Sequence, residues 1–337
     1  MSGRTRFLLR AIVGIAISVA AFALVFRSVD PGVTARILGE AVPSWLALVV
    51  AFLLVDVVIR AVRWQRLLAP IRHVPFLATL AYLLVGYLAN NVLPARLGEL
   101  VRCHYLGDRE RLSRTTALGT VVVERVVDIA VVVAIAAFAI VVLSIRGLVA
   151  NAVVLGVAIV VLLAVALAIG IVAHRIPGAE RLAAAVARWP RIGELATKLR
   201  DGLSVAGRPR TLFEALALSV VAWGATLLAF AAAGQAVGIQ LTIGQASLLA
   251  SGVALAAAIP SGPASLGTFE FAGVRIAQSL GIAAEPAFAI ALIVHAAILA
   301  TTSIGGVVAL TRLGWRREPS DAVAESATVT TRPEVAE

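Results

Sequence analysis

Two short stretches, PARLG at residues 94–98 and PASLG at residues 263–267, differ at a single position in a chain dominated by Ala, Val, Leu and Ile. Pro and Gly interrupt helices, because Pro lacks an amide donor and Gly is conformationally free. Pro, Ala, Leu and Gly are abundant here, so composition alone can produce such a similarity. The segments around each stretch decide whether it marks a repeated unit.

The composition is that of an integral membrane protein. The chain has 337 residues, of which 61% are hydrophobic and 14% charged, and its mean hydropathy is +0.99. These values lie outside the range of soluble globular domains. Five apolar runs reach the roughly 20 residues that cross a bilayer: residues 7–26, 116–143, 151–173, 212–236 and 286–310. The first follows a basic start, but it is too long for a signal peptide and lacks a clear cleavage site, so we interpret it as a span.

Several classes of function are excluded by the polar residues. The net charge of +10 reflects the basic residues that accumulate in cytoplasmic loops, and no basic patch interleaved with aromatic residues points to a nucleic-acid partner. Cys103 is the only cysteine, and the four His are scattered without metal-ligand spacing. We therefore expect no metal site and no cofactor, and we do not expect an enzyme.

The basic residues also orient the chain in the membrane, because Lys and Arg favour the cytoplasmic side. The strongest basic stretch, residues 174–210, is placed in the cytoplasm as an amphipathic segment, with Ile192, Leu195, Leu199 and Leu203 at helical spacing. Both chain ends are basic, which predicts two cytoplasmic termini and an even number of crossings. The expected location is the bacterial cytoplasmic membrane.

Two apolar segments cannot cross the membrane once. Residues 76–93 have arginines on both flanks, so both flanks favour the cytoplasm. This predicts a re-entrant hairpin that turns at residues 90–94. Residues 244–283 lie between a span that ends outside and a span that starts outside, so they must enter and return from the opposite face, turning at residues 259–263. PARLG and PASLG lie at these two turns.

The offset from Pro94 to Pro263 is 169 residues, and it also relates the neighbouring segments. It moves the span near 44–68 onto the span near 212–236, and Ala117 onto Pro286. We therefore predict inverted repeats at about 44–145 and 212–313, as in many secondary transporters. The predicted fold is an all-α polytopic membrane domain, residues 1–313, with about six transmembrane helices and two re-entrant hairpins. Residues 314–337 are expected to form a disordered cytoplasmic tail.

Broken helices at membrane depth are tolerated where they are buried in protein or line a wet cavity. The half-helices that follow the turns begin near Arg96 and Ser265, and a helix N-terminus attracts anions such as a lipid phosphate. The alternative is a structural loop packed between helices. Arg96 corresponds to Ser265 in the other copy, so stronger anion binding is expected at the cytoplasmic hairpin.

Each hairpin carries further candidate ligands. Arg96, Glu99 and Arg102 share one helical face, and two Arg around one Glu can hold a phosphate. A helix cap is the alternative for this set, and an internal salt bridge between Glu270 and Arg275 is the alternative for the second hairpin. The remaining hairpin candidates are Asn90, Asn91, Gly98, Ser261, Ser265 and Gly267.

Two of the spans contain charged residues, which are costly in a membrane and call for a partner or a function. Glu124 and Asp128 share a helical face, for which we favour a transport role, and the spacing does not require Arg125 to pair with either. The secondary candidates, Asp56, Arg60 and Arg63, lie on one helical face of the span near 44–68, where Asp56 and Arg60 have the i, i+4 spacing of an ion pair. Arg60 and Arg63 can alternatively snorkel to the cytoplasm.

The same residues carry a family resemblance. The stretches RAVRWQRLL, NNVLPARLGELVR, VVVERVVDIAVV and AAAIPSGPASLGTFE together resemble the flippase-like family that shares the transmembrane region of lysylphosphatidylglycerol synthases. The resemblance extends to about Leu313 and implies a lipid flippase. The soluble domain of the bifunctional synthases is not recognised, so synthesis of lysyl-lipid is not expected. The residues whose roles the resemblance implies are Asn91, Arg96, Gly98, Glu99, Arg102, Glu124, Arg125, Asp128, Gly267 and Glu270.

The leading hypothesis is a flippase or transporter that moves an anionic phospholipid, or a polyprenyl or glycolipid intermediate, between leaflets. A second is a membrane enzyme that transfers a glycosyl or head group to a lipid phosphate, with Glu124 and Asp128 as acid and base. No metal-binding carboxylate motif or nucleotide loop supports it. A third is an accessory subunit of a membrane glycosyltransferase, and a homo-oligomer is a further possible assembly.

Overall fold

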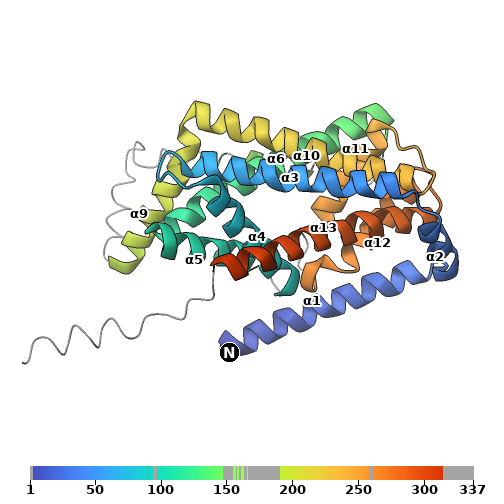
Figure 1. Ribbon diagram of the computed structural model, residues 1–337, viewed down its shortest axis with the longest axis horizontal. Helices are drawn as coiled ribbons and strands as arrows, with labels where there is room; N and C mark the ends of the chain where they lie inside the picture. The colour runs from blue at the N-terminus through green and yellow to red at the C-terminus, as the bar shows by residue number, and fades with distance from the viewer. Residues whose placement is uncertain are drawn as a thin grey trace, which may run out of the picture.

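The computed structural model describes residues 3–93, 97–146, 190–258 and 261–313, together with isolated positions between 155 and 165. Within these residues every regular element is a helix (Figure 1), which confirms the predicted all-α class. Most of the predicted span at residues 151–173 lies outside the described residues, as does all of the predicted tail at residues 314–337. The domain boundaries at the chain ends therefore stay predictions.

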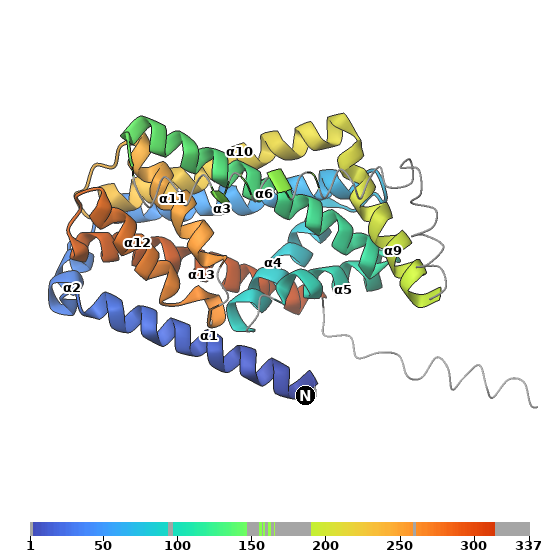
Figure 2. The same cartoon turned by 180° about the vertical axis from the view of Figure 1, so that it is seen from behind.

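Among the residues that the structure describes, four helices are long and apolar enough to cross a membrane, which confirms a multi-pass protein. They are α3 (Pro43–Leu68), α6 (Arg114–Leu143), α10 (Pro209–Ala236) and α13 (Ala284–Leu313). They run along the long axis of the molecule in both views (Figures 1 and 2). A fifth span is obtained when α1 and α2 are taken together. The predicted number of six crossings stays a prediction.

A sharp bend joins α1 (Gly3–Phe26) to α2 (Pro31–Gly39), with 85° between the two helix axes. The Asp30 side chain caps α2 by accepting hydrogen bonds from the amides of Gly32 and Val33, at 2.7 and 3.1 Å. Pro31 stands in the first turn, where its missing amide proton costs nothing. Asp30-Pro31 is thus a helix-start signal that lies outside the apolar runs.

The first predicted hairpin is formed by α4 (Phe76–Val92) and α5 (Gly98–Glu110), which pack against each other in opposite directions. Near the turn the Asn90 side chain accepts a hydrogen bond from the Gly98 amide at 2.7 Å, and at the far end Tyr82 donates to Glu110 at 2.8 Å. Gly86 faces the Gly98 carbonyl so closely that a Cβ would collide with it. Small residues therefore permit the tight pairing.

The second predicted hairpin is formed by α11 (Ile243–Ala257) and α12 (Thr268–Ser279), with the short 3₁₀ turn η4 (Pro263–Ser265) between them. Ala264, Ser265 and Gly267 have positive φ angles of 58°, 57° and 84°. Side chains are strained in this region, and at Gly267 a Cβ would also collide with the Ser18 carbonyl of α1. The PASLG turn is therefore a tightly enclosed part of the fold.

The 169-residue offset holds for whole helices. It places α3 on α10, α4 on α11, α5 on α12 and α6 on α13, and each helix end falls within four residues of its counterpart. The packing repeats too, since α4 packs on α13 as α11 packs on α6. The helices α3 and α10 run in opposite directions, because Val42 bonds to Ala236 at one end and Arg63 bonds to Ser219 further along. This is the relation expected between inverted repeats.

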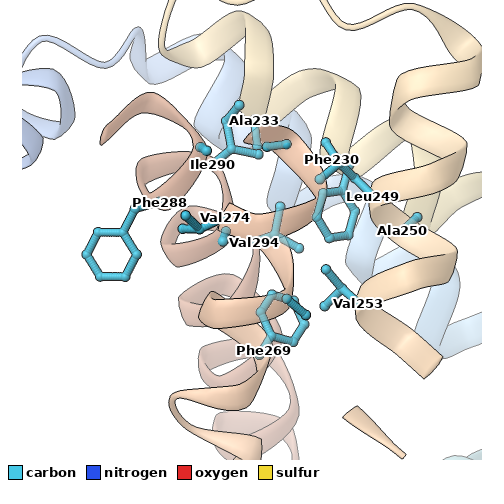
Figure 3. Close-up of a cluster of buried hydrophobic side chains, with 14 of the residues drawn as sticks. Phe230, Ala233, Leu249, Ala250, Val253, Phe269, Val274, Phe288, Ile290 and Val294 are labelled. Carbon is cyan, nitrogen blue, oxygen red and sulfur yellow. The ribbon is translucent and has the colours of Figure 1, made fainter. Parts of the chain in front are cut away.

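The largest hydrophobic core among the described residues lies mainly between α10, α11, α12 and α13 of the second repeat, with Val49 and Leu53 of α3 and Val25 of α1 packed into it. Figure 3 shows Phe230, Leu249, Val253 and Phe269 gathered around Val294. The predicted amphipathic helix forms as α9 (Pro190–Leu203), followed by the 3₁₀ turn η3 (Ser204–Gly207). It packs on α6 where Gly202 meets Gly119 and leaves no room for a Cβ.

Candidate functional site

The tips of the two hairpins meet near the middle of the molecule (Figures 1 and 2). Two cavities, of about 390 and 650 Å³, lie at this junction. Both are lined by residues from the end of α4 and from the end of α11. The residues that line both cavities are Tyr87, Asn90, Asn91, Arg125, Ala257, Ala258, Phe269 and Ile298.

The first cavity is bordered by the charged stripe of α3. Arg60 donates from Nε to both carboxylate oxygens of Asp56 at 2.8 Å, which confirms the pair anticipated from i, i+4 spacing. Its Nη1 lies 3.4 Å from Asp128 on α6, and its guanidinium lies 4.9 Å from the ring centre of Trp223 on α10. Carboxylates and an aromatic face thus hold this cation inside the helix bundle.

Arg63 lies deeper and its side chain has no exposed surface. It donates to both oxygens of Asp128 and, at 2.6 Å, to Ser219, and it lies 3.1 Å from Glu124. Snorkelling to the cytoplasm is therefore the wrong interpretation for Arg63, because its guanidinium is enclosed between α3, α6 and α10.

Two further arginines complete the network on the other side of Glu124. Arg102 of α5 is buried, with Nη1 3.1 Å from Glu124 and its guanidinium 4.6 Å from the ring centre of Trp64. Arg125 donates to Glu124 at 2.6 Å and lies 3.7 Å from Asp128. Its side chain is 40% exposed and borders both cavities. Arg102 lines neither cavity, so Arg125 is the arginine that a ligand in both would meet.

These ion pairs connect seven residues into one network with four cations and three anions, and hence a net charge of plus one. Within the described residues, five arginine nitrogen atoms of the network are buried without a hydrogen-bond acceptor, against one carboxylate oxygen without a donor. Buried donors without acceptors are unfavourable. Two of these atoms, Arg102 Nη1 and Glu124 Oε2, lie 3.1 Å apart as an ion pair. Arg63 and Arg102 line neither cavity, so an anion in the cavities reaches the network at Arg60 and Arg125. The members of the network are Asp56, Arg60, Arg63, Arg102, Glu124, Arg125 and Asp128.

The first hairpin tip is fixed by its asparagines. Asn90 caps α5 at Gly98, and Asn91 donates to the hydroxyls of Thr302 and Ser303 on α13 at 2.9 and 3.0 Å. Glu99 lines the second cavity and not the first. Arg96 lies outside the described residues. Asn90 and Asn91 thus hold the tip as well as bordering the site.

The second hairpin tip is fixed by Glu270 and by His295 of α13. Glu270 accepts a hydrogen bond from the Gly267 amide at 2.7 Å and lies 2.5 Å from Nδ1 of His295. The other ring nitrogen of His295 lies 2.9 Å from the Ala264 carbonyl. An internal salt bridge between Glu270 and Arg275 is therefore wrong: Arg275 is exposed and donates to Gln278.

The second cavity is lined by the hydroxyl-bearing residues of this tip. Ser261 and Ser265 line it, as do His295 and two residues of α1, Val13 and Gly14. Ser261 accepts a hydrogen bond from Thr268 at 3.1 Å. The backbone amide of Gly262 donates to the buried hydroxyl of Ser18 at 3.0 Å, so α1 contacts the tip directly.

Four contributors to the site were not among the sequence-based candidates: Tyr87, Trp223, Thr226 and His295. Thr226 donates to Asp56, and Trp223 donates to Asp128, both at 3.3 Å. His295 is a titratable residue within an otherwise apolar span, which is a signal by itself. Trp, Tyr and Thr are ordinary in apolar helices, so nothing in their spacing distinguishes these three.

Comparisons with known proteins agree with the membrane character of this site. The family model described as "Lysylphosphatidylglycerol synthase TM region" matches residues 11–306. A Haloferax volcanii protein named "Glycosyltransferase AglD" is 26% identical over 139 residues, which are 40% of this chain and 22% of that protein. The matched segment thus spans about a fifth of that relative's length. No solved structure matches the chain.

Proposed function

The chain belongs to the family of the lysylphosphatidylglycerol synthase transmembrane region, and on this premise we propose that it moves an anionic lipid between the leaflets of the membrane. The family and the apolar helices support a multi-pass membrane protein that is related to lipids. The cargo proposed is an anionic phospholipid or a polyprenyl-linked or glycolipid intermediate.

The observation that carries the proposal is the position of the charged network. It borders two adjoining cavities at the point where two hairpins meet, deep among apolar helices. A charge at membrane depth is costly, so charged residues at this depth usually indicate a functional site. Discontinuous helices that meet near the centre of an inverted repeat are the usual place for a transporter's substrate.

The geometry suggests how a head group would pass. Arg125 borders both cavities and 40% of its side chain is exposed, so a phosphate could bind to it from either cavity. Arg60 and the tips of both hairpins would complete the contacts. The acyl or prenyl chains would stay outside, along the exposed apolar faces of the long helices. Transport then requires only that the head group changes sides at Arg125.

The test is leaflet exchange in liposomes. The full-length protein would be reconstituted with phosphatidylglycerol carrying a fluorescent nitrobenzoxadiazole group, and dithionite would bleach the outer leaflet. Protein-dependent loss of the protected inner signal is expected. Arg125→Gln should lower the exchange rate by about tenfold or more, which corresponds to roughly 1.4 kcal/mol of barrier.

A matched control is available on α3. Arg66 is exposed and lies three residues after Arg63, so Arg66→Gln removes one positive charge outside the network. Its exchange rate should stay within about twofold of the wild type, since surface substitutions rarely exceed 0.5 kcal/mol. Exchange equal to that of protein-free liposomes, for every anionic lipid tried, would refute the proposed function.

A second candidate function is supported by the match to the Haloferax volcanii protein, whose name is that of a glycosyltransferase. In this version the chain is an accessory subunit of a membrane glycosyltransferase, or itself transfers a glycosyl or head group. The buried position of Glu124, which lines neither cavity and is enclosed by arginines, argues against its use as a catalytic acid or base. Product formed without leaflet exchange would favour this candidate.

The location and assembly belong to the proposal as well. The loops α3–α4, α5–α6 and η3–α10, which contain Arg72, Arg111 and Arg208, lie at one end of the bundle (Figure 1), and Arg109 at the end of α5 bonds to the C-terminal end of α13. By the positive-inside rule this end would face the cytoplasm of a bacterial inner membrane. A homo-oligomer or a glycosyltransferase partner remains part of the proposal, as do cytoplasmic termini.

A further inference from the structure

The charged network sets a condition on the charge of its ligand. Its seven residues are joined by ion pairs of 2.6 to 3.7 Å, apart from the closest contact, between Arg63 and Asp128. Six of the seven side chains are at most 12% exposed. Their charges therefore compensate each other in a medium where an unbalanced charge is costly. Four arginines against three carboxylates leave one positive charge unbalanced.

The network is most accessible to a ligand at one of its members. Arg60, Arg63 and Arg102 are held by carboxylates and by aromatic or hydroxyl neighbours in the interior. Arg125 is the most exposed member, with 40% of its side chain accessible, whereas Arg63 and Arg102 are buried and line neither cavity. A ligand in the first cavity can therefore neutralise the network at Arg125, whereas in the second cavity the carboxylate of Glu99 already acts on this arginine. Glu99 lines only the second cavity, and no ion pair within the described ranges joins it to the network.

We propose that the site selects lipids whose head group carries one negative charge, as a phosphodiester does, over lipids with a phosphomonoester or a pyrophosphate. This inference deepens the proposed function and rests on it. A phosphodiester brings the network to neutrality. A phosphomonoester carries up to two negative charges at neutral pH, and a polyprenyl pyrophosphate, with a further ionised phosphate, carries about two to three, so either leaves a negative charge in the apolar bundle. A zwitterionic head group leaves the positive charge unbalanced.

The proposal is tested by competition binding to the purified full-length protein in uncharged detergent micelles, with fluorescent phosphatidylglycerol as tracer. The competitors are phosphatidylglycerol, phosphatidic acid, a polyprenyl pyrophosphate and phosphatidylethanolamine. Phosphatidylglycerol should bind at least about tenfold more tightly than each of the other three, the factor that roughly 1.4 kcal/mol represents. Phosphatidic acid or the pyrophosphate binding as tightly as phosphatidylglycerol would overturn the inference.

Charge-shift variants make the test independent of any one lipid. Asp56→Asn gives the network a charge of plus two and should move the preference towards phosphatidic acid and the pyrophosphate. Arg125→Gln makes the network neutral and should bring phosphatidylethanolamine level with phosphatidylglycerol. Glu124→Gln, also plus two, replaces Asp56→Asn if that variant does not fold, as judged by gel filtration. Arg66→Gln leaves the network intact and should keep the wild-type order; an order unchanged in the network variants contradicts the proposal.

The source of the phosphodiester is tested with glycerophosphoglycerol, the same head group without acyl chains. It should compete more weakly than the lipid, because the chains contribute apolar contacts outside the site. Equal affinity for the lipid and the free head group would overturn a lipid as the ligand. Leaflet exchange is scored separately. Exchange of anionic lipids without the predicted charge order removes this inference and keeps the proposed function, whereas ordered binding without exchange removes the function and keeps the charge rule.

Discussion

The two repeats have the same arrangement of helices but different side chains at matching interior positions. The 169-residue offset maps the network positions Arg60, Arg63 and Arg102 onto Ala229, Ala232 and Phe271, and maps Glu124 and Asp128 onto Ile293 and Ala297. All five counterparts belong to the hydrophobic core of the second repeat or pack against it. One scaffold thus places the arginine–carboxylate network in one half and aliphatic and aromatic side chains at these matching positions of the other.

This difference indicates which repeat stabilises the fold and which repeat binds the ligand. Ion pairs in an apolar interior contribute little net stability, because removing the charges from water costs about what the pairing returns. Close packing of apolar side chains is the more dependable source of stability. We therefore expect the second repeat to stabilise the bundle and the first repeat to bind the ligand.

The largest effect is expected when the network loses its central cation. Arg63→Leu leaves Asp128 and Glu124 without their buried partner, and breaking a buried ion pair from one side costs about 3–5 kcal/mol. The free energy of unfolding, measured in detergent by denaturant titration, should fall by that amount, and lipid binding should be lost with it. Arg66→Leu on the exposed side of α3 should change the free energy of unfolding by less than about 0.5 kcal/mol. Equal effects of the two variants would show that the network is not a unit.

A smaller loss, confined to stability, is expected in the second repeat. Leu249 lies in the core and lines neither cavity. Leu249→Ala should lower the free energy of unfolding by about 2–4 kcal/mol through lost packing, while lipid affinity per folded molecule stays unchanged. Leu228→Ala, at a side chain 47% exposed on α10, is the control and should cost less than about 1 kcal/mol. A change of lipid preference in Leu249→Ala would contradict the division between the halves.

The smallest effects are expected at the hairpin tips, where the two halves are most alike. Asn91→Ala removes the bonds to Thr302 and Ser303, and Ser18→Ala removes the acceptor of the Gly262 amide. Each should cost about 1–2 kcal/mol, as for a buried polar group that loses its partner. Hydrogen exchange of the tip amides should rise in the altered hairpin first. Faster exchange spread evenly over the bundle would indicate global destabilisation instead.

Much of the fold was predictable because transmembrane helices are recognised in a sequence by their length and hydropathy. PARLG and PASLG located both hairpin turns, and the offset between them paired the helices of the two halves. The bend between α1 and α2 was missed because α2 has nine residues, too few to register as a span. The number of crossings depends on residues 151–173, which the structure describes at few positions.

The site was only partly predictable, for a physical reason. Spacing identifies pairs within one helix, as for Asp56 and Arg60, but Arg63 meets Asp128 and Ser219 from helices far along the chain. Neighbours in sequence also mislead: Arg125 follows Glu124 directly and still pairs with it, because its long side chain bends back. His295 needed the tertiary structure, since its partners Glu270 and Ala264 belong to another helix and a turn.

The helix α13 touches both hairpin tips, through Thr302 and Ser303 at one and His295 at the other. These contact points are about two turns apart on one rigid rod. A shift of that rod along its axis would displace both attachment points together and by the same distance. The two hairpin tips are therefore linked through α13. Such a shift cannot release one tip without also straining the contacts of the other.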